Sequence, residues 1–77
     1  MIEILINEFE WNSNKKRLKD IIKKLINSGW KKFGNNGTLV FFKDIPLNQA
    51  KKEMKNLDIT EFEPEEWYEE LYSNNIF

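Results

Sequence analysis

The 77-residue sequence contains no cysteine and no histidine. The absence of cysteine excludes disulfide bonds and thiolate zinc sites, and it favours a reducing compartment. Without histidine, the chain lacks the side chain that most often performs general acid–base catalysis near neutral pH. Its serines therefore have no histidine to activate them as nucleophiles. We expect a non-catalytic protein that uses no cofactor and holds no metal ion.

Long apolar runs are also missing, and no stretch approaches the ~20 residues that a membrane-spanning helix needs. The first residues, MIEILINEFEW, carry acids where a secretory signal would carry bases. These features predict a cytoplasmic protein. Hydrophobic residues make up 40% of the chain and aromatic residues 14%, enough for a packed core. The length then predicts a single domain over residues 1–77.

The net charge of −1 conceals a strong separation of charges along the chain. Residues 1–10 hold three acids and no base. Residues 11–55 hold all twelve bases and three acids, and residues 56–77 hold seven acids and no base. Such asymmetry predicts a molecule with charged faces, unless the basic and acidic segments lie side by side and neutralise each other.

The first half of the chain predicts a strand followed by a helix. Apolar side chains alternate through residues 2–11, which is typical of a strand with apolar residues on both faces. Asn12-Ser13-Asn14 then supplies good helix caps, and Gly29 suits the left-handed residue that ends a helix. Apolar residues between them recur at i, i+3, i+4, i+7 and i+8, which predicts one apolar helical stripe. The stripe consists of Leu18, Ile21, Ile22, Leu25 and Ile26.

A hairpin and a second helix are predicted next. Two β-rich runs, 30–33 and 38–43, flank residues 34–37, whose Gly and Asn accept the positive φ values of a tight turn. Pro46 marks the start of the second helix. The apolar side of this helix is expected to consist of Leu47, Ala50, Met54 and Leu57.

The last part of the chain predicts a fourth strand and a third helix. Residues 58–62 form the strand, and Pro64 opens a helix over residues 65–72, because proline fits a first helical turn and Glu65 and Glu66 suit its positive dipole end. The fold class is therefore α+β, with the order βαββαβ and an extra C-terminal helix. This is the ferredoxin-like arrangement, a four-stranded antiparallel sheet with two helices on one face.

The other face of this sheet is uncovered unless something packs on it, and monomers rarely expose a large apolar patch. Ile2, Ile4 and Ile6 are expected to meet the helices. The far face is expected to carry Leu5, Phe9 and Trp11, joined by either Val40 and Phe42 or Leu39 and Phe41. The aromatic stripe of the predicted third helix is one candidate cover. A homodimer, as an accessory or structural protein, is the alternative.

Residues 61–72, EFEPEEWYEELY, hold six glutamates and no base. Displayed on a rigid helix, these carboxylates resemble a row of phosphates and would suit a basic groove on another protein. We therefore expect a protein-binding module that offers an acidic C-terminal surface to a basic, nucleic-acid-handling partner such as a nuclease complex. The expected partner-binding residues are Glu61, Glu63, Glu65, Glu66, Trp67, Tyr68, Glu69 and Glu70.

In its small size, single domain and acidic face, the chain resembles many phage and plasmid inhibitors of host defence nucleases, such as anti-CRISPR and anti-restriction proteins. This is a resemblance of type and involves no family motif. It implies an inhibitor or regulator that acts in the host cell cytoplasm.

Nucleic-acid binding is the alternative function, through the basic helix or the open sheet face. The βαββαβ order is that of RNA-recognition modules, and residues 37–54 look like their third strand and second helix. Their basic-Gly-aromatic-Gly pattern is missing, however, and Leu5 stands where a stacking aromatic is needed. The residues expected to contact phosphates are Lys15, Lys16, Lys19, Lys23, Lys31 and Lys32.

Overall fold

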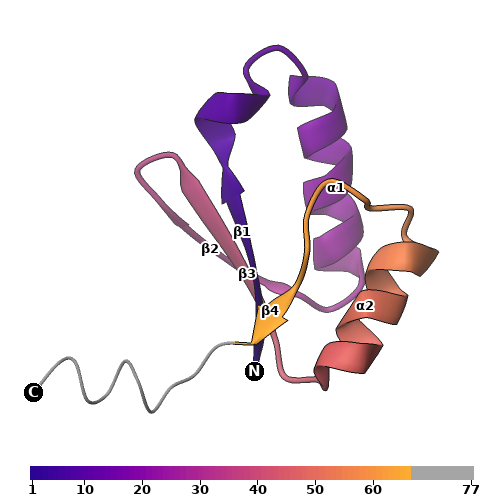
Figure 1. Cartoon of the computed structure of the whole chain (residues 1–77). Helices are drawn as coiled ribbons and strands as arrows, with labels where there is room; N and C mark the ends of the chain where they lie inside the picture. Colours follow the sequence, from indigo (N-terminus) through magenta and orange to yellow (C-terminus); the bar gives the residue numbers. More distant parts are fainter. Residues whose placement is uncertain (67–77) are drawn as a thin grey trace, which may run out of the picture.

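The computed structural model of the chain describes residues 1–66, apart from the side chain of Asn35 (Figure 1). It is an α+β structure with a four-stranded antiparallel sheet and two α-helices. In chain order the elements are β1 (Ile2–Asn7), the 3₁₀ helix η1 (Glu8–Trp11), α1 (Lys15–Asn27), β2 (Lys31–Asn35), β3 (Thr38–Lys43), α2 (Leu47–Asn56) and β4 (Glu65–Glu66).

The strand order is β2-β3-β1-β4, so the first strand of the chain lies inside the sheet. Every neighbouring pair is antiparallel. Both helices lie on the same side of the sheet, and the opposite side is not covered by any described element (Figure 1). Within residues 1–66, neither helix is long and apolar enough to cross a membrane.

The core lies between the sheet and the two helices. Ile2, Ile4 and Ile6 are at most 1% exposed, which confirms that this side of β1 meets the helices. Leu39 and Phe41 of β3 are also buried. Because side chains alternate along a strand, Val40 and Phe42 lie on the open face. The helices and loops contribute Leu18, Ile21, Leu25, Trp30, Ala50, Met54 and Ile59 to this core.

The β2–β3 hairpin confirms the predicted tight turn. Asn36 and Gly37 have φ values of 50° and 87°, as a two-residue turn matched to the strand twist requires. The carbonyl of Gly37 also accepts a hydrogen bond from the Glu8 amide at 2.8 Å. A Cβ atom at Gly37 would overlap the ring of Phe9. Glycine is therefore needed here both for its φ value and for the close approach of η1.

The predicted strand over residues 2–11 is too long, since β1 ends at Asn7 and residues 8–11 form η1. The side chain of Asn7 caps this turn by accepting a hydrogen bond from the Phe9 amide at 3.1 Å. After this turn, the ring centroid of Trp11 lies 5.4 Å from that of Phe62, and both rings are partly buried. Trp11 therefore packs against the core and does not join the open face.

The predicted strand at residues 58–62 is also wrong. Asp58 has a positive φ of 58°, which reverses the chain after α2, and the amide of Ile59 returns to the carbonyl of Met54 at 2.9 Å. Ile59 is then buried as a core residue, and the chain pairs with β1 only at Glu65–Glu66. The C-terminal helix predicted from residue 65 is therefore wrong for Glu65 and Glu66, because these two residues form β4. The remainder of the predicted C-terminal helix lies outside the described residues.

Candidate protein-interaction surface

The open sheet face carries two cross-strand rows of side chains. The first row runs from Lys31 on β2 through Phe42 and Glu3 to Glu65 on β4, and the second consists of Phe33, Val40 and Leu5. Phe33 is 64% exposed and Leu5 is 54% exposed. The centre of the face is therefore apolar and accessible in the described part of the chain, as the sequence predicted for an uncovered sheet.

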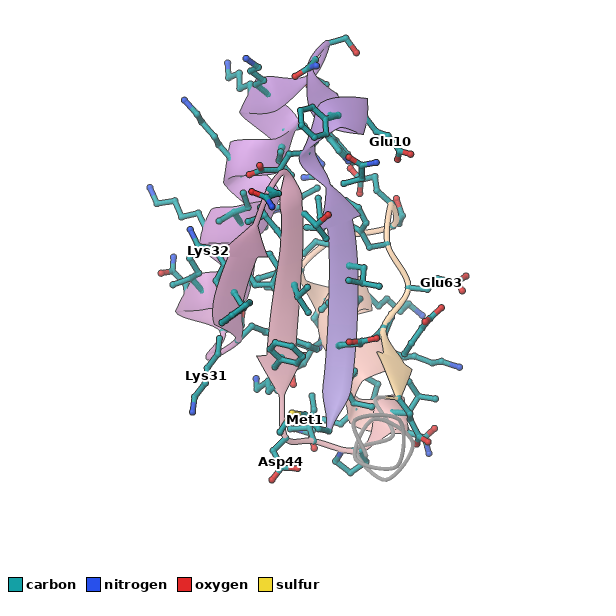
Figure 2. All side chains as sticks on the ribbon, turned by 90° about the vertical axis from the view of Figure 1, so that its left-hand side faces the viewer. Met1, Glu10, Lys31, Lys32, Asp44 and Glu63 are labelled. Atoms are coloured by element: carbon teal, nitrogen blue, oxygen red, sulfur yellow. The ribbon has the colours of Figure 1, made fainter. Side chains whose placement is uncertain are left out.

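Opposite charges lie at opposite edges of this face. In Figure 2, which looks onto the open face, Lys31 and Lys32 project from the β2 edge, whereas Glu10 and Glu63 lie at the far edge, beyond β1. Both lysines are exposed, and no ion pair within the described part of the chain involves them. We call Lys31 and Lys32 the basic edge; Lys31 lies on the open face, and Lys32, opposite the buried Phe41, lies on the helix side of β2. The segregation seen along the sequence thus persists in three dimensions across the sheet.

We define the acidic edge as Glu3, Glu63 and Glu65. Its residues come from the two ends of the described chain, on β1 and on or just before β4. Glu3 lies directly opposite Glu65 in the β1–β4 pair, so two carboxylates are cross-strand neighbours. Burial, and then the charge of Glu65, raise the pKa of Glu3 above its ordinary value. No ion pair within residues 1–66 neutralises these three glutamates. Because no base pairs with them there, this edge has a negative electrostatic potential. The repulsion between the facing carboxylates of Glu3 and Glu65 also destabilises the β1–β4 pair.

A shallow groove runs along the acidic edge. It has a volume of about 240 Å³, and its walls come from β1 and from the segment that leads into β4. Leu5 and Phe62 supply apolar wall, and the acidic edge supplies carboxylates. The groove therefore combines apolar walls with negative charge. Such a surface suits an apolar side chain flanked by a base.

Glu61, one of the predicted partner-binding residues, forms a contact within the chain. Its carboxylate accepts hydrogen bonds from Arg17 Nε at 2.6 Å and Arg17 Nη2 at 3.1 Å, and Arg17 also reaches the carbonyl of Asp58 at 2.7 Å. The hydrogen bond from Arg17 lowers the pKa of Glu61 to about 2. This contact ties α1 to the segment after α2, so Glu61 is already paired within the chain.

Acidification is expected to weaken the fold through Glu61. Because its pKa falls from 4.5 in the unfolded chain to about 2 when folded, its contribution is present above pH 4.5 and is lost as the pH falls through the folded pKa. The pair is solvent-accessible and screened, so we expect a loss of about 1 kcal/mol. Urea unfolding between about pH 5 and about pH 2 measures this effect. The variant Glu61→Gln should lose less stability over that range; an identical pH dependence would contradict the assignment.

The basic residues of α1 divide into two groups. Lys24 lies 3.4 Å from Asp20 and donates to the carbonyl of Leu57 at 3.0 Å, so it belongs to the fold. The others are exposed and form no ion pair within the described residues: Lys15, Lys16, Lys19 and Lys23. Lys15 and Lys19 flank a second groove of about 390 Å³ beside Phe9. These lysines are thus available to an anionic ligand, as the alternative prediction requires.

Sequence reasoning missed two contributors to the open face and its edges. Glu3 was not among the predicted site residues, because nothing local places it beside Glu65, 62 positions later. The sequence predicts a strand at Phe33 but not the side of the sheet on which its ring lies. Its register opposite Val40 places it on the open face. Of the predicted acidic residues, Glu63, Glu65 and Glu66 lie at or beside this edge. Trp67, Tyr68, Glu69 and Glu70 lie outside the described residues.

Within the described part of the chain, no group of three or more acidic side chains is placed to hold a metal ion. The features that stand out in residues 1–66 are an exposed apolar strip and two edges of opposite charge. Both are features of an interaction surface. Comparisons of the chain with protein-family models, with curated proteins and with solved structures found no match.

Proposed function

We propose that this chain is a non-catalytic protein-binding module whose acidic edge receives a basic surface of another protein. In its most specific form it is an inhibitor or regulator, of the phage-encoded anti-CRISPR or anti-restriction type, that competes with nucleic acid for a basic site. The observation that carries the proposal is the cross-strand pair of Glu3 and Glu65. Two neighbouring carboxylates without a base reduce the stability of the fold, and a basic partner would relieve that repulsion.

We also propose that the fold is the ferredoxin-like, or split βαβ, arrangement. Two connections support it. Helix α1 joins β1 to β2, which run parallel with β3 between them, and α2 joins β3 to β4, which run parallel with β1 between them. This arrangement brings the N-terminal acids and the acids around β4 to the same edge.

Neutralising Glu63 and Glu65 of the acidic edge, together with the adjacent Glu66, is expected to abolish capture of the partner. The variant Glu63→Gln/Glu65→Gln/Glu66→Gln removes three negative charges and leaves the Arg17–Glu61 contact intact. The measurement is a pull-down from a bacterial lysate with and without nuclease treatment, using the tagged wild-type chain and the variant. We expect a protein that survives nuclease treatment, dissociates in high salt and is lost with the variant, because salt screens exposed charges.

The control variant Glu8→Gln/Asp44→Asn removes carboxylates outside the acidic edge and should retain the captured protein. Equal capture by the wild type and the acidic-edge variant would refute the proposal. Material that disappears on nuclease treatment, and that is lost when Lys15, Lys16, Lys19 and Lys23 are changed to glutamine, would instead establish the alternative function. In that case the exposed face of α1 binds RNA or DNA.

A further inference from the structure

We propose that a second copy of this chain covers the open sheet face, forming a two-fold dimer in which the basic edge of each copy lies over the acidic edge of the other. This inference goes beyond the proposed function, because it assigns the apolar centre of the face as well as its edges. It rests on the exposure of that centre and on the positions of Lys31 and Glu65 within a single cross-strand row.

The apolar strip is continuous across three strands. Phe33 on β2, Val40 on β3 and Leu5 on β1 are direct neighbours in one row, and Phe42 of the adjacent row lies beside Val40. Phe33 and Leu5 are each more than half exposed. An apolar strip of this kind, bordered by charged residues, is typical of an interface and costs free energy when it is left in water.

The charges at the two edges favour a second copy as the partner of the open face, and they also favour one orientation of that copy. A two-fold axis that runs between the sheets, parallel to the strands, places β2 of one copy over β4 of the other at the same level along the strands. Lys31 and Glu65 are the two ends of one row, so each Lys31 then faces the Glu65 of the other copy. A two-fold axis across the strands would place β2 over β2 and bring edges of the same charge together. Charge complementarity therefore favours the first geometry.

The apolar residues of the second row match in the same orientation, whereas in the first row Phe42 lies over Glu3 of the other copy. Val40 and Leu5 occupy the two inner strands of one row, so the two-fold axis places Val40 of each copy over Leu5 of the other. Phe33 of one copy then faces the groove of the other, whose walls include Leu5 and Phe62. Aligned sheets pack about 10 Å apart with interdigitating side chains. An apolar centre with oppositely charged ends is self-complementary, as an isologous interface requires.

Charge exchange between Lys31 and Glu65 tests this dimer in the full-length chain. Sedimentation velocity is measured over a range of concentrations for the wild type, Lys31→Glu, Glu65→Lys and the double variant. We expect the wild type to dimerise, and each single variant to bind itself about tenfold more weakly or worse, because each places like charges together at two symmetric contacts. The double variant, and an equimolar mixture of the two single variants, should restore the dimer.

Two controls distinguish an effect of these variants on dimerisation from an effect on folding. Both positions are exposed, and Glu65→Lys replaces the repulsion at Glu3 with an attraction, so thermal unfolding should show a folded chain for each variant. Lys51→Glu makes the same charge change on the exposed side of α2 and should leave dimerisation unchanged. A wild-type monomer at high concentration, as expected if residues 67–77 or another protein covers the face, would overturn the proposal. Failure of the double variant to recover the dimer would overturn it as well.

The dimer and the proposed partner both use Glu65 of the acidic edge, so the two compete for this residue, and each is measured separately: dimerisation with the purified chain and capture of the partner with the lysate. A chain that dimerises but captures no basic protein retains this inference and loses the proposed function. A chain that captures a basic protein as a monomer does the opposite. The two measurements therefore distinguish failure of the dimer from failure of the proposed function.

Discussion

The variant Phe41→Ala is expected to lower the free energy of unfolding by about 3–5 kcal/mol. Phe41 is fully buried at the centre of the sheet, where β3 lies between β2 and β1 and its cross-strand partner on β1 is Ile4. Removing the ring takes away apolar contacts and leaves a cavity between the sheet and the helices. A domain of this size has a total stability of only ~3–5 kcal/mol from a single core. The variant should therefore be largely unfolded at room temperature.

Urea unfolding followed by circular dichroism measures this loss in dilute solution. The matched control is Phe33→Ala, the same chemical change on the neighbouring strand at a side chain that is 64% exposed. We expect the control to change stability by about 0.5 kcal/mol or less, since exposed side chains contribute little to the folded monomer. Equal losses in the two variants would show that the assignment of faces on β2 and β3 is wrong.

The variant Glu53→Ala is expected to lower the free energy of unfolding by about 1–3 kcal/mol. Glu53 Oε1 accepts hydrogen bonds from Lys43 Nζ at 2.7 Å and from the indole Nε1 of Trp30 at 3.3 Å. Lys43 also donates to the carbonyl of Ser28 at 2.6 Å, so one cluster joins α2, β3 and the end of α1. The Lys43 and Glu53 side chains are 22% and 20% exposed, and the loss of Glu53 leaves a partly buried ammonium without its counter-charge.

Thermal unfolding of Glu53→Ala and Glu53→Gln separates the hydrogen bonds from simple packing. Glutamine keeps an acceptor oxygen for Lys43 and Trp30, so its stability should lie between those of the wild type and the alanine variant. Added salt should narrow the gap between the wild type and Glu53→Gln only slightly, because partly buried pairs are weakly screened. If alanine and glutamine destabilise equally, the acceptor oxygen contributes nothing and the cluster is held by packing.

The sequence predicted the helices and the hairpin because their signals are local. Helix α1 needs only its apolar stripe and its glycine end, and the hairpin turn needs only residues that tolerate positive φ. The helix-facing side of β1 follows from strict alternation of isoleucines. Each of these features depends on residues within a few positions of one another, so pattern and propensity are sufficient to identify it.

The segment after α2 shows where local signals fail. Residues 58–62 have the composition of a strand, yet they do not pair with the sheet. Ile59 is buried in the core instead, and Arg17 of α1 binds the carboxylate of Glu61 and the carbonyl of Asp58. Glu65 and Glu66 have the helix-start signal of a preceding proline, yet they pair with β1. In both cases tertiary packing outweighs a local preference of a few tenths of a kcal/mol per residue.

Composition and spacing alone thus established the α+β class, the two helices, the hairpin and the separation of charge along the chain. The positions of those charges in space depend on strand pairings between distant segments. The pairing of Glu3 with Glu65 and the placement of Lys31 at the opposite edge follow from the strand order β2-β3-β1-β4. Strand order is decided by burying the whole core at once, a property of the entire chain that no local stretch of sequence encodes.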